Sequence, residues 1–200
     1  RLNVFASDIS PLTYTGLEQT PNFTLTFTDV NGNTVNSLVG NEYTIKYYKD
    51  NIETKVLEVG TYKAIIVSEN FAFNTQGSYL FTKVLKEFLV NKAYLTEVKF
   101  IGDTSVTYNS NFQTPLTAEF KFNNNVISNI SYQISYTKNG VLQPNGILNV
   151  GTYLATLTIS SDTFMISEQT DITKEVKITP YELSLTTPSE NEIWFSKDYG

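Results

Sequence analysis

The sequence predicts an all-β protein in which two tandem β-sandwich domains follow each other end to end. Three observations lead to this prediction. Apolar and polar residues alternate over short runs, tyrosine and phenylalanine are abundant at 13 residues each, and whole segments recur about 90 residues further along the chain. The 200 residues therefore divide into domains 1–92 and 93–183, each near the size of one sandwich, and residues 184–200 open a third, incomplete repeat.

The clearest recurring segment is Val59-Gly60-Thr61-Tyr62, which returns as Val150-Gly151-Thr152-Tyr153. In immunoglobulin-like sandwiches, a tyrosine near the start of strand F hydrogen-bonds back across the preceding turn and fixes how the strand enters the core. We therefore predict that both sandwiches are immunoglobulin-like. Each has a structural corner formed by the glycine and the tyrosine of this segment, namely Gly60 and Tyr62 in the first domain and Gly151 and Tyr153 in the second.

Taken in order, the first domain begins with a predicted strand around Leu2–Phe5. The run Phe23–Thr28 alternates strictly, with its apolar side chains on one face, as a strand packed on one side does. It leads to Asn31-Gly32, a pair that predicts a type I′ hairpin turn. Strand C is predicted at Tyr43–Tyr47, the corner strand follows, and the last strand of the domain is predicted at Lys86–Val90.

The second domain repeats this order. Its strands are predicted at Ala118–Phe122, Tyr132–Tyr136 and Lys174–Ile178, with turn signals between them at asparagine and glycine. Short polar joints, Asn91–Leu95 and Thr179–Leu183, follow the last strand of each domain. Because these joints are short, we expect the strand that leaves one sandwich to become the first strand of the next.

Two departures from the usual pattern bear on the prediction. Ala64 and Ala155 stand where strand F of an antibody domain has its cysteine, so a small apolar side chain fills the space of the disulfide. Ser110 replaces the glycine that the first domain has at Gly16. Serine disfavours a positive φ, so this conformation is alternatively expected at one of the flanking asparagines, Asn109 or Asn111.

Several of these segments together resemble the MBG family of immunoglobulin-like repeats, which occur in large bacterial surface and secreted proteins. The resemblance rests on Tyr14-Thr15-Gly16 with Pro21, on Tyr43–Asn51, on Val59–Tyr62 and on Val90–Leu95. It covers nearly the whole chain. It implies tandem arrays on the outside of a cell, as stalks or as parts of adhesins, and it implies no catalytic residues.

The composition excludes several classes of function. Without cysteine or histidine, the chain has no disulfide, thiol nucleophile, Ser-His-Asp triad or histidine-bound metal. The net charge of −6 includes no basic stripe, which argues against nucleic-acid binding and direct membrane contact. We therefore predict a protein that is not an enzyme, with no cofactor and no metal site.

Two features leave a binding role open. Phe71, Phe73, Tyr79 and Phe81 form an aromatic insertion in the first domain that either stacks on a sugar or peptide or completes the core. The loop Asp29–Asn33 has alternating oxygen-bearing side chains, as half of a calcium loop has, but also the residues of a plain hairpin. A lysine–asparagine isopeptide cross-link is a further possibility, with no pair identified.

The function expected from the sequence is that of an extracellular, cell-surface spacer whose partners are the neighbouring repeats of the same chain. The alternative is a binding module that recognises a host glycan or protein through the aromatic insertion or a groove between the domains.

Overall fold

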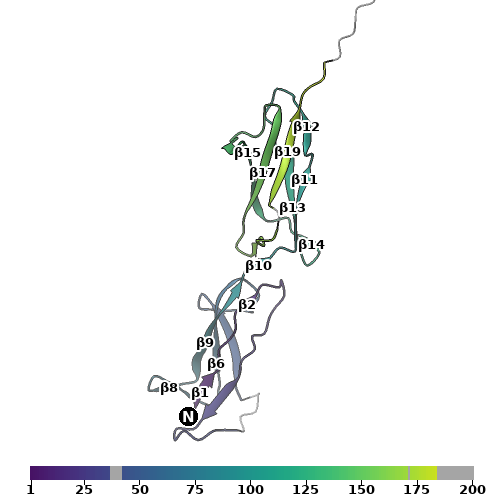
Figure 1. The fold of residues 1–200 in the computed structure, drawn as a ribbon. Helices are drawn as coiled ribbons and strands as arrows, with labels where there is room; N and C mark the ends of the chain where they lie inside the picture. The colour runs from purple at the N-terminus through teal and green to yellow at the C-terminus, as the bar shows by residue number, and fades with distance from the viewer. Residues whose placement is uncertain (37–41, 171, 184–200) are drawn as a thin grey trace, which may run out of the picture. The chain divides into compact units, whose positions relative to one another are not determined.

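A computed structural model describes residues 1–36, 42–170 and 172–183, and these form an all-β protein without a helix (Figure 1). None of them therefore belongs to a helix long and apolar enough to cross a membrane. The all-β prediction is confirmed for this part of the chain. The predicted third repeat at residues 184–200 lies outside the described residues.

The chain divides into two compact units. Unit 1 comprises Arg1–Val98, Phe120–Ser131 and Ile159–Thr170, and unit 2 comprises Lys99–Glu119, Tyr132–Thr158 and the described part of Asp171–Gly200. These units are defined by contacts within the structure, whereas the predicted domains 1–92 and 93–183 are defined by the sequence repeat. The domain boundaries at residues 92 and 93 stay a prediction.

The largest sheet of unit 1 has five strands in the order β2-β9-β6-β4-β5. Their bounds are β2 (Leu12–Thr13), β9 (Thr82–Asn91), β6 (Gly60–Val67), β4 (Thr44–Lys49) and β5 (Ile52–Glu53). The two central pairs are antiparallel, whereas the short β2 runs parallel to β9, with Leu12 opposite Val90. A register shift between Ala64 and Ile65 marks a bulge in β6.

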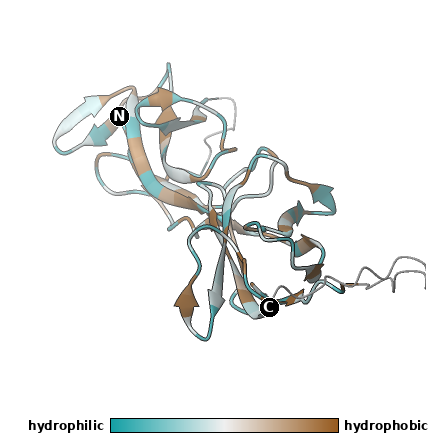
Figure 2. Cartoon of the chain, turned by 90° about the horizontal axis from the view of Figure 1, so that it is seen from above, coloured by the Kyte–Doolittle hydropathy of each residue, from teal (hydrophilic) through white to brown (hydrophobic). Residues whose placement is uncertain are grey.

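Unit 1 also contains three two-stranded sheets. They pair β1 (Asn3–Ala6) with β3 (Leu25–Thr28), β7 (Phe73–Thr75) with β8 (Ser78–Leu80), and β10 (Ala93–Tyr94) with β18 (Phe164–Met165). The first two pairs are antiparallel and the third is parallel. Brown hydrophobic bands are interspersed with white and teal bands of lower hydropathy along the strands, as expected where one strand face is buried (Figure 2).

The core of unit 1 lies between these layers. Val4 and Phe27, from β1 and β3, pack with Ile66 of β6, which makes this part of the fold sandwich-like. Along β6, Tyr62, Ala64 and Ile66 alternate with more exposed residues, so one face of the strand is buried throughout. Ala64 is fully buried, so the small apolar side chain expected in the core at this position is found there.

A second five-stranded sheet has the order β12-β19-β17-β15-β16. Most of its residues lie in unit 2. Its strands are β12 (Ser105–Thr107), β19 (Thr173–Thr179), β17 (Gly151–Ser160), β15 (Ser131–Lys138) and β16 (Val141–Leu142). A three-stranded sheet has the order β11-β13-β14, with bounds β11 (Glu97–Gly102), β13 (Leu116–Phe122) and β14 (Asn125–Val126). Again the short first strand, β12, runs parallel to the last, β19.

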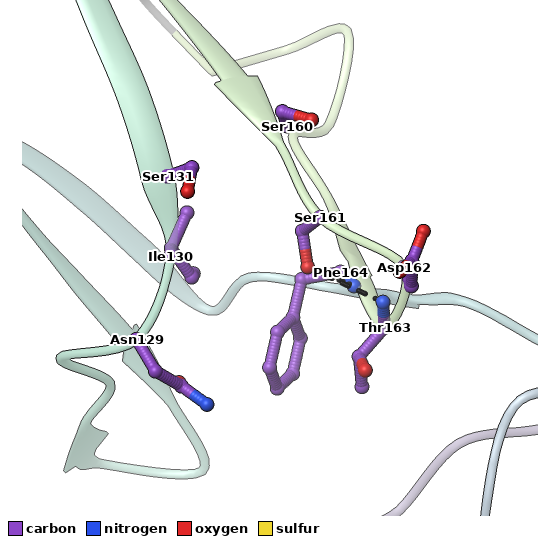
Figure 3. Close-up of a pocket in the computed structure, with 8 residues that line it drawn as sticks. All are labelled: Asn129, Ile130, Ser131, Ser160, Ser161, Asp162, Thr163 and Phe164. Atoms are coloured by element: carbon purple, nitrogen blue, oxygen red, sulfur yellow. Dashed lines mark hydrogen bonds between the residues drawn. The ribbon is translucent and has the colours of Figure 1, made fainter.

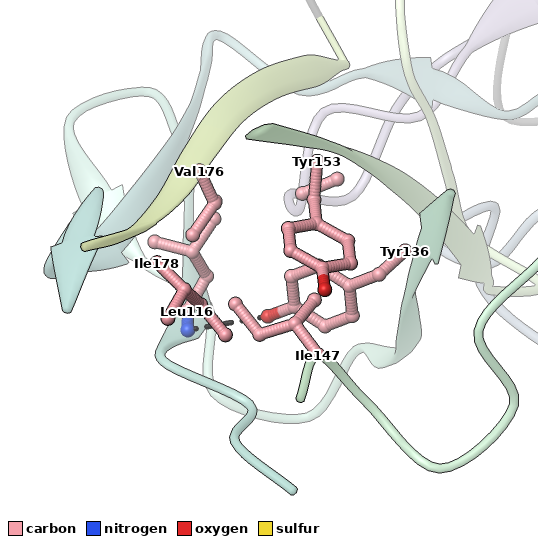
Figure 4. Close-up of a cluster of buried hydrophobic side chains, with 7 residues drawn as sticks. Leu116, Tyr136, Ile147, Tyr153, Val176 and Ile178 are labelled. Atoms are coloured by element: carbon pink, nitrogen blue, oxygen red, sulfur yellow. Dashed lines mark hydrogen bonds between the residues drawn. The ribbon is translucent and has the colours of Figure 1, made fainter. Parts of the chain in front are cut away.

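The core of unit 2 gathers side chains from both sheets (Figure 4). Tyr136 of β15 and Tyr153 of β17 lie with Val176 and Ile178 of β19, and Leu116 of β13 closes the cluster. The Leu116 N–H donates to the Tyr136 hydroxyl oxygen at 3.3 Å, so the buried phenol has a hydrogen-bond partner.

The turns follow the local chemistry of the sequence with two differences. The residues of Asp50-Asn51 and of Asn139-Gly140 have positive φ and form the two-residue loops that join β4 to β5 and β15 to β16. The type I′ turn predicted at Asn31-Gly32 is wrong, because only Gly32 has a positive φ. The Asp29 N–H instead donates to the Asn33 carbonyl, which closes a longer loop.

The second difference concerns Ser110. Its own φ is 66°, close to the 81° of Gly16, so the serine adopts the left-handed conformation that was expected at Asn109 or Asn111. The side-chain oxygen of Asn109 accepts the Asn111 N–H at 3.0 Å, an Asx turn that holds the loop in this conformation.

Candidate functional site

The β6 corner, formed by Lys49, Gly60 and Tyr62, fixes the entry of β6 into the core of unit 1. The buried Tyr62 hydroxyl donates to the Glu58 carbonyl at 2.9 Å and accepts the Glu58 N–H at 3.0 Å. The Lys49 ammonium donates to the Val59 carbonyl at 2.8 Å and lies 5.8 Å from the centre of the Tyr62 ring. The turn is thus held both by the phenol and by a cation that lies over the phenol ring.

The β17 corner, formed by Lys138, Gly151 and Tyr153, has the same arrangement in unit 2. The buried Tyr153 hydroxyl donates to the Asn149 carbonyl at 2.6 Å, again four residues before the tyrosine. The Lys138 ammonium donates to the Val150 carbonyl at 2.9 Å and lies 5.1 Å from the Tyr153 ring centre.

The backbone conformation favours glycine at both corners, and a larger residue would also displace the lysine that donates to the turn. Gly60 has a φ of 142° and Gly151 a φ of 140°, values that a side chain disfavours. A Cβ would also lie 2.8 Å from Cε of Lys49 at the first corner and 2.8 Å from Nζ of Lys138 at the second. The sequence identified the glycines and tyrosines but not the lysines, although each lysine directly precedes the two-residue turn after strand C.

Two tyrosines that pack in the cores, Tyr47 and Tyr136, are uncharged phenols. Burial raises the pKa of Tyr47 and of Tyr136 above its ordinary value of 10.0, so both phenols are neutral at physiological pH. Within the described residues, no group of three acidic, histidine or cysteine side chains is arranged to hold a metal ion.

The four residues of the aromatic insertion do not form one exposed row. Phe73 is fully buried, and the half-buried Phe71 packs against the same cluster. Tyr79 is half-buried, with the Arg1 guanidinium 5.1 Å from its ring centre. Only Phe81 is largely exposed, at 57%. A ligand at these residues stays a prediction, with Phe81 as the side chain best placed to touch it.

A second aromatic group in unit 1, the Tyr14 cluster, consists of Tyr14, Phe122 and Phe164. The Tyr14 ring lies 5.6 Å from Phe164 in an edge-to-face contact and 6.1 Å from Phe122, and the two phenylalanines are 5.2 Å apart. Such contacts add about 0.5–1.5 kcal/mol each beyond the burial of area. This cluster was not predicted from the sequence, because its members are far apart in the chain.

Hydrogen bonds reinforce the same region of unit 1. The Lys92 ammonium donates to the Ser161 carbonyl, and the Ala93 N–H donates to the Thr163 carbonyl at 3.0 Å. The parallel β10–β18 pair extends this contact. The polar joint that the sequence placed after β9 is therefore held by both backbone and side-chain bonds.

A pocket of about 390 Å³ lies next to this contact (Figure 3). The Ser161 hydroxyl oxygen accepts the N–H groups of Thr163 and Phe164 at 3.2 and 3.1 Å, which ends β17 in a serine turn. The pocket is lined by Asn129, Ile130, Ser131, Ser160, Ser161, Asp162, Thr163 and Phe164. Its one aromatic ring, Phe164, is nearly buried, so little of that face is available for a sugar to stack on.

A matching hollow of about 360 Å³ occurs where β6 ends. There the Ser68 hydroxyl oxygen accepts the N–H groups of Asn70 and Phe71, both at 3.1 Å, and donates to the Glu42 carbonyl. The same serine turn thus produces a hollow at the end of both corner strands. This recurrence favours strand-end geometry, and not a dedicated ligand, as the origin of both pockets.

The Asp29 loop has its carboxylate satisfied within the hairpin. One oxygen accepts the N–H groups of Asn31 and Asn33 at 2.8 and 2.9 Å, and the other accepts the Asn33 side-chain amide. These bonds lower the pKa of Asp29 below its ordinary 3.8, the Asn33 side-chain bond most of all. The arrangement is that of a hairpin that an aspartate holds closed.

Comparison with protein-family models, with curated proteins and with solved structures finds no match to this chain.

Proposed function

We propose that this chain consists of two tandem immunoglobulin-like β-sandwich repeats of the MBG type, arranged end to end. Their role is that of a spacer in an extracellular bacterial surface protein or a secreted, adhesin-like protein. The neighbouring repeats of the same chain are its partners, and the proposal involves no catalytic, cofactor or metal site.

The observation that carries the proposal is the recurrence of the corner. Tyr62 and Tyr153 donate to the carbonyl four residues upstream, and Lys49 and Lys138 donate to the carbonyl just before the glycine. Four side chains at matching places in the chain, with matching partners, are typical of repeated domains and not of a single irregular sheet protein.

A second set of contacts supports the same assignment. Leu12–Thr13 pairs parallel with the end of β9, and Val106–Thr107 pairs parallel with the end of β19. The Gln19 side-chain amide donates to the Thr13 carbonyl at 3.1 Å, and that of Gln113 donates to the Thr107 carbonyl at 3.2 Å. A short first strand beside the last strand thus recurs with its own side-chain anchor.

Small-angle X-ray scattering on the purified chain tests the spacer role. Strands rise about 3.3 Å per residue, so each repeat with its loops is on the order of 40 Å long and two end to end reach about 80 Å. A compact 200-residue globule is roughly 55 Å across. A maximum dimension near the smaller value would contradict the proposal, and a compact protein of equal length provides the matched standard.

The surface location has an independent test. An antibody against the purified chain should label intact cells of the source organism or its culture medium. Signal found only after lysis would overturn the extracellular assignment while leaving the fold assignment untouched.

The alternative function, binding of a host glycan or protein, is favoured by the exposure of Phe81 beside Leu80, which is also exposed. A glycan and host-protein screen with wild type and a Phe81→Ser variant tests it. A ligand retained by wild type and lost by the variant would support a binding module, with Val141→Ser, another exposed apolar position, as the control.

A further inference from the structure

The further inference concerns an apolar pocket of about 500 Å³ in unit 2, the Tyr108 pocket, and it rests on the proposed function. Its apolar lining consists of Tyr108, Val150, Pro180, Tyr181 and Leu183. These residues come from the segment after β12, from the β17 corner and from the segment after β19. The pocket therefore lies at one end of the unit 2 sheet, where the chain leaves β19.

The backbone around Tyr108 matches the backbone around Tyr14. The Tyr14 N–H donates to the Asn91 carbonyl at 2.9 Å, and the Tyr108 N–H donates to the Thr179 carbonyl at 2.9 Å. Both tyrosines follow directly on the short strand that pairs parallel with the last strand. Each also packs against the core of its own unit. The two rings thus hold equivalent places.

The surroundings of the two rings differ. Tyr14 lies against Phe122 and Phe164, whereas the equivalent Tyr108 lines an open pocket. Among the described residues, no aromatic contact of the Tyr14 kind is formed by the Tyr108 ring.

The residues after the last strand show the same contrast. If Asn91 corresponds to Thr179, then Ala93 corresponds to Tyr181 and Leu95 to Leu183. Ala93 and Leu95 are 2% and 5% exposed, whereas Tyr181 and Leu183 are 64% and 81% exposed. Removing two such large apolar side chains from water would favour association. Two exposed apolar side chains beside an apolar pocket form a surface that suits an apolar binding partner.

We propose that the Tyr108 pocket is the docking surface for a further domain of the same class. That domain presents two phenylalanines placed as Phe122 and Phe164 are placed against Tyr14. Its ring pair covers Tyr108, and the chain that enters it buries Leu183 as Leu95 is buried in unit 1. The occupant is thus a sandwich domain with an aromatic pair at the end that docks, where a serine turn of the Ser161 kind also lies.

The test uses the full chain with residues 96–183 duplicated in tandem after Leu183. The joint Tyr181–Leu183 then takes the place that residues 93–95 have in the original chain. Because the chain has no cysteine, a Tyr108→Cys variant in the first copy of the segment carries a single thiol. The rate at which a maleimide labels this thiol reports how well the pocket is covered.

We expect labelling of Tyr108→Cys to slow at least tenfold in the duplicated chain relative to the original chain. Serine in place of both Phe122 and Phe164 in the added copy should restore the fast rate. Tyr14→Cys in the original chain is the matched control, since its cover is already present. Val141→Cys, at an exposed site, should react equally fast in every chain.

Equal labelling of Tyr108→Cys in both chains, with the added copy folded by circular dichroism, would overturn the proposal. Protection that persists after both serine substitutions would also overturn it, because the cover would then not be the aromatic pair. If Tyr108→Cys fails to fold, Val150→Cys gives the same readout from the same pocket. A compact scattering profile of the original chain refutes the spacer role, whereas fast labelling in an elongated duplicated chain refutes only the docking.

Discussion

Replacing Tyr62 by phenylalanine removes one oxygen atom and leaves the ring in place. The lost hydroxyl makes two hydrogen bonds at the β6 corner, to the carbonyl and from the N–H of Glu58. Each bond is worth about 1 kcal/mol net, so Tyr62→Phe should lower the free energy of unfolding by about 2 kcal/mol. Tyr153→Phe removes one bond, to Asn149, and should cost about 1 kcal/mol.

The two variants should therefore rank in a definite order. A domain of 60–100 residues loses about 4–8 °C of melting temperature per kcal/mol, which places the shift near 10 °C for Tyr62→Phe and near 5 °C for Tyr153→Phe. Urea unfolding followed by near-ultraviolet circular dichroism measures the free energies. Hydrogen exchange assigns each transition to its strands.

Tyr48→Phe is the matched control. The Tyr48 hydroxyl donates to the Glu53 carboxylate at 3.2 Å in an exposed contact, so its loss should change stability by less than about 0.5 kcal/mol. If Tyr62→Phe and Tyr48→Phe unfold at the same urea concentration, the β6 corner does not contribute as argued here.

Three further predictions follow from other sites. Lys138→Met should lower the free energy of unfolding by about 1 kcal/mol in urea unfolding, because it removes the bond to the Val150 carbonyl and the contact with the Tyr153 ring. Lys55→Met, which removes an exposed ion pair, is the control and should have little effect. Ser110→Gly should raise stability by about 1 kcal/mol in the same assay, since glycine adopts the 66° φ without strain, and an unchanged midpoint would contradict this. The pKa of Asp29 is lower in the folded state than its unfolded value of 3.8, so its contribution to the free energy of unfolding is present above pH 3.8 and is lost as the pH falls through the folded pKa. Asp29→Asn should therefore remove that part of the acid dependence when the melting temperature is measured as a function of pH.

Much of the strand order was accessible from the sequence, because buried faces impose a period of two. The alternating run Phe23–Thr28 contains β3, Tyr43–Tyr47 overlaps β4, and Lys86–Val90 lies within the longer β9. The Asn31-Gly32 turn was mistaken because the local signal ignores Asp29. That carboxylate binds backbone N–H groups two and four residues on, and so selects a longer loop.

The side-chain contacts at the corners and at Tyr14 were less accessible. Lys49 follows the predicted strand Tyr43–Tyr47, and nothing in the sequence shows that its ammonium bonds to a carbonyl ten residues later. Tyr14 meets Phe122 and Phe164 across more than 100 residues of sequence, a contact that only the folded backbone defines. The folded backbone also decides which members of the aromatic insertion are buried. Phe73 lies in a strand and is buried, whereas Phe81 lies between two strands and is exposed.

The parallel pairing of β2 with β9 has a mechanical consequence. When the two ends of the segment 1–92 are pulled apart, β2 is drawn toward its own start and β9 toward its own end. Since the strands run parallel, these directions are opposite along the shared axis, and the hydrogen bonds between them bear the tension side by side in shear. They must then break together and not one after another, as they would if the strands were peeled apart. The pair β12 with β19 has the same geometry, so each half of the chain contains a parallel strand pair that is loaded in shear in this way.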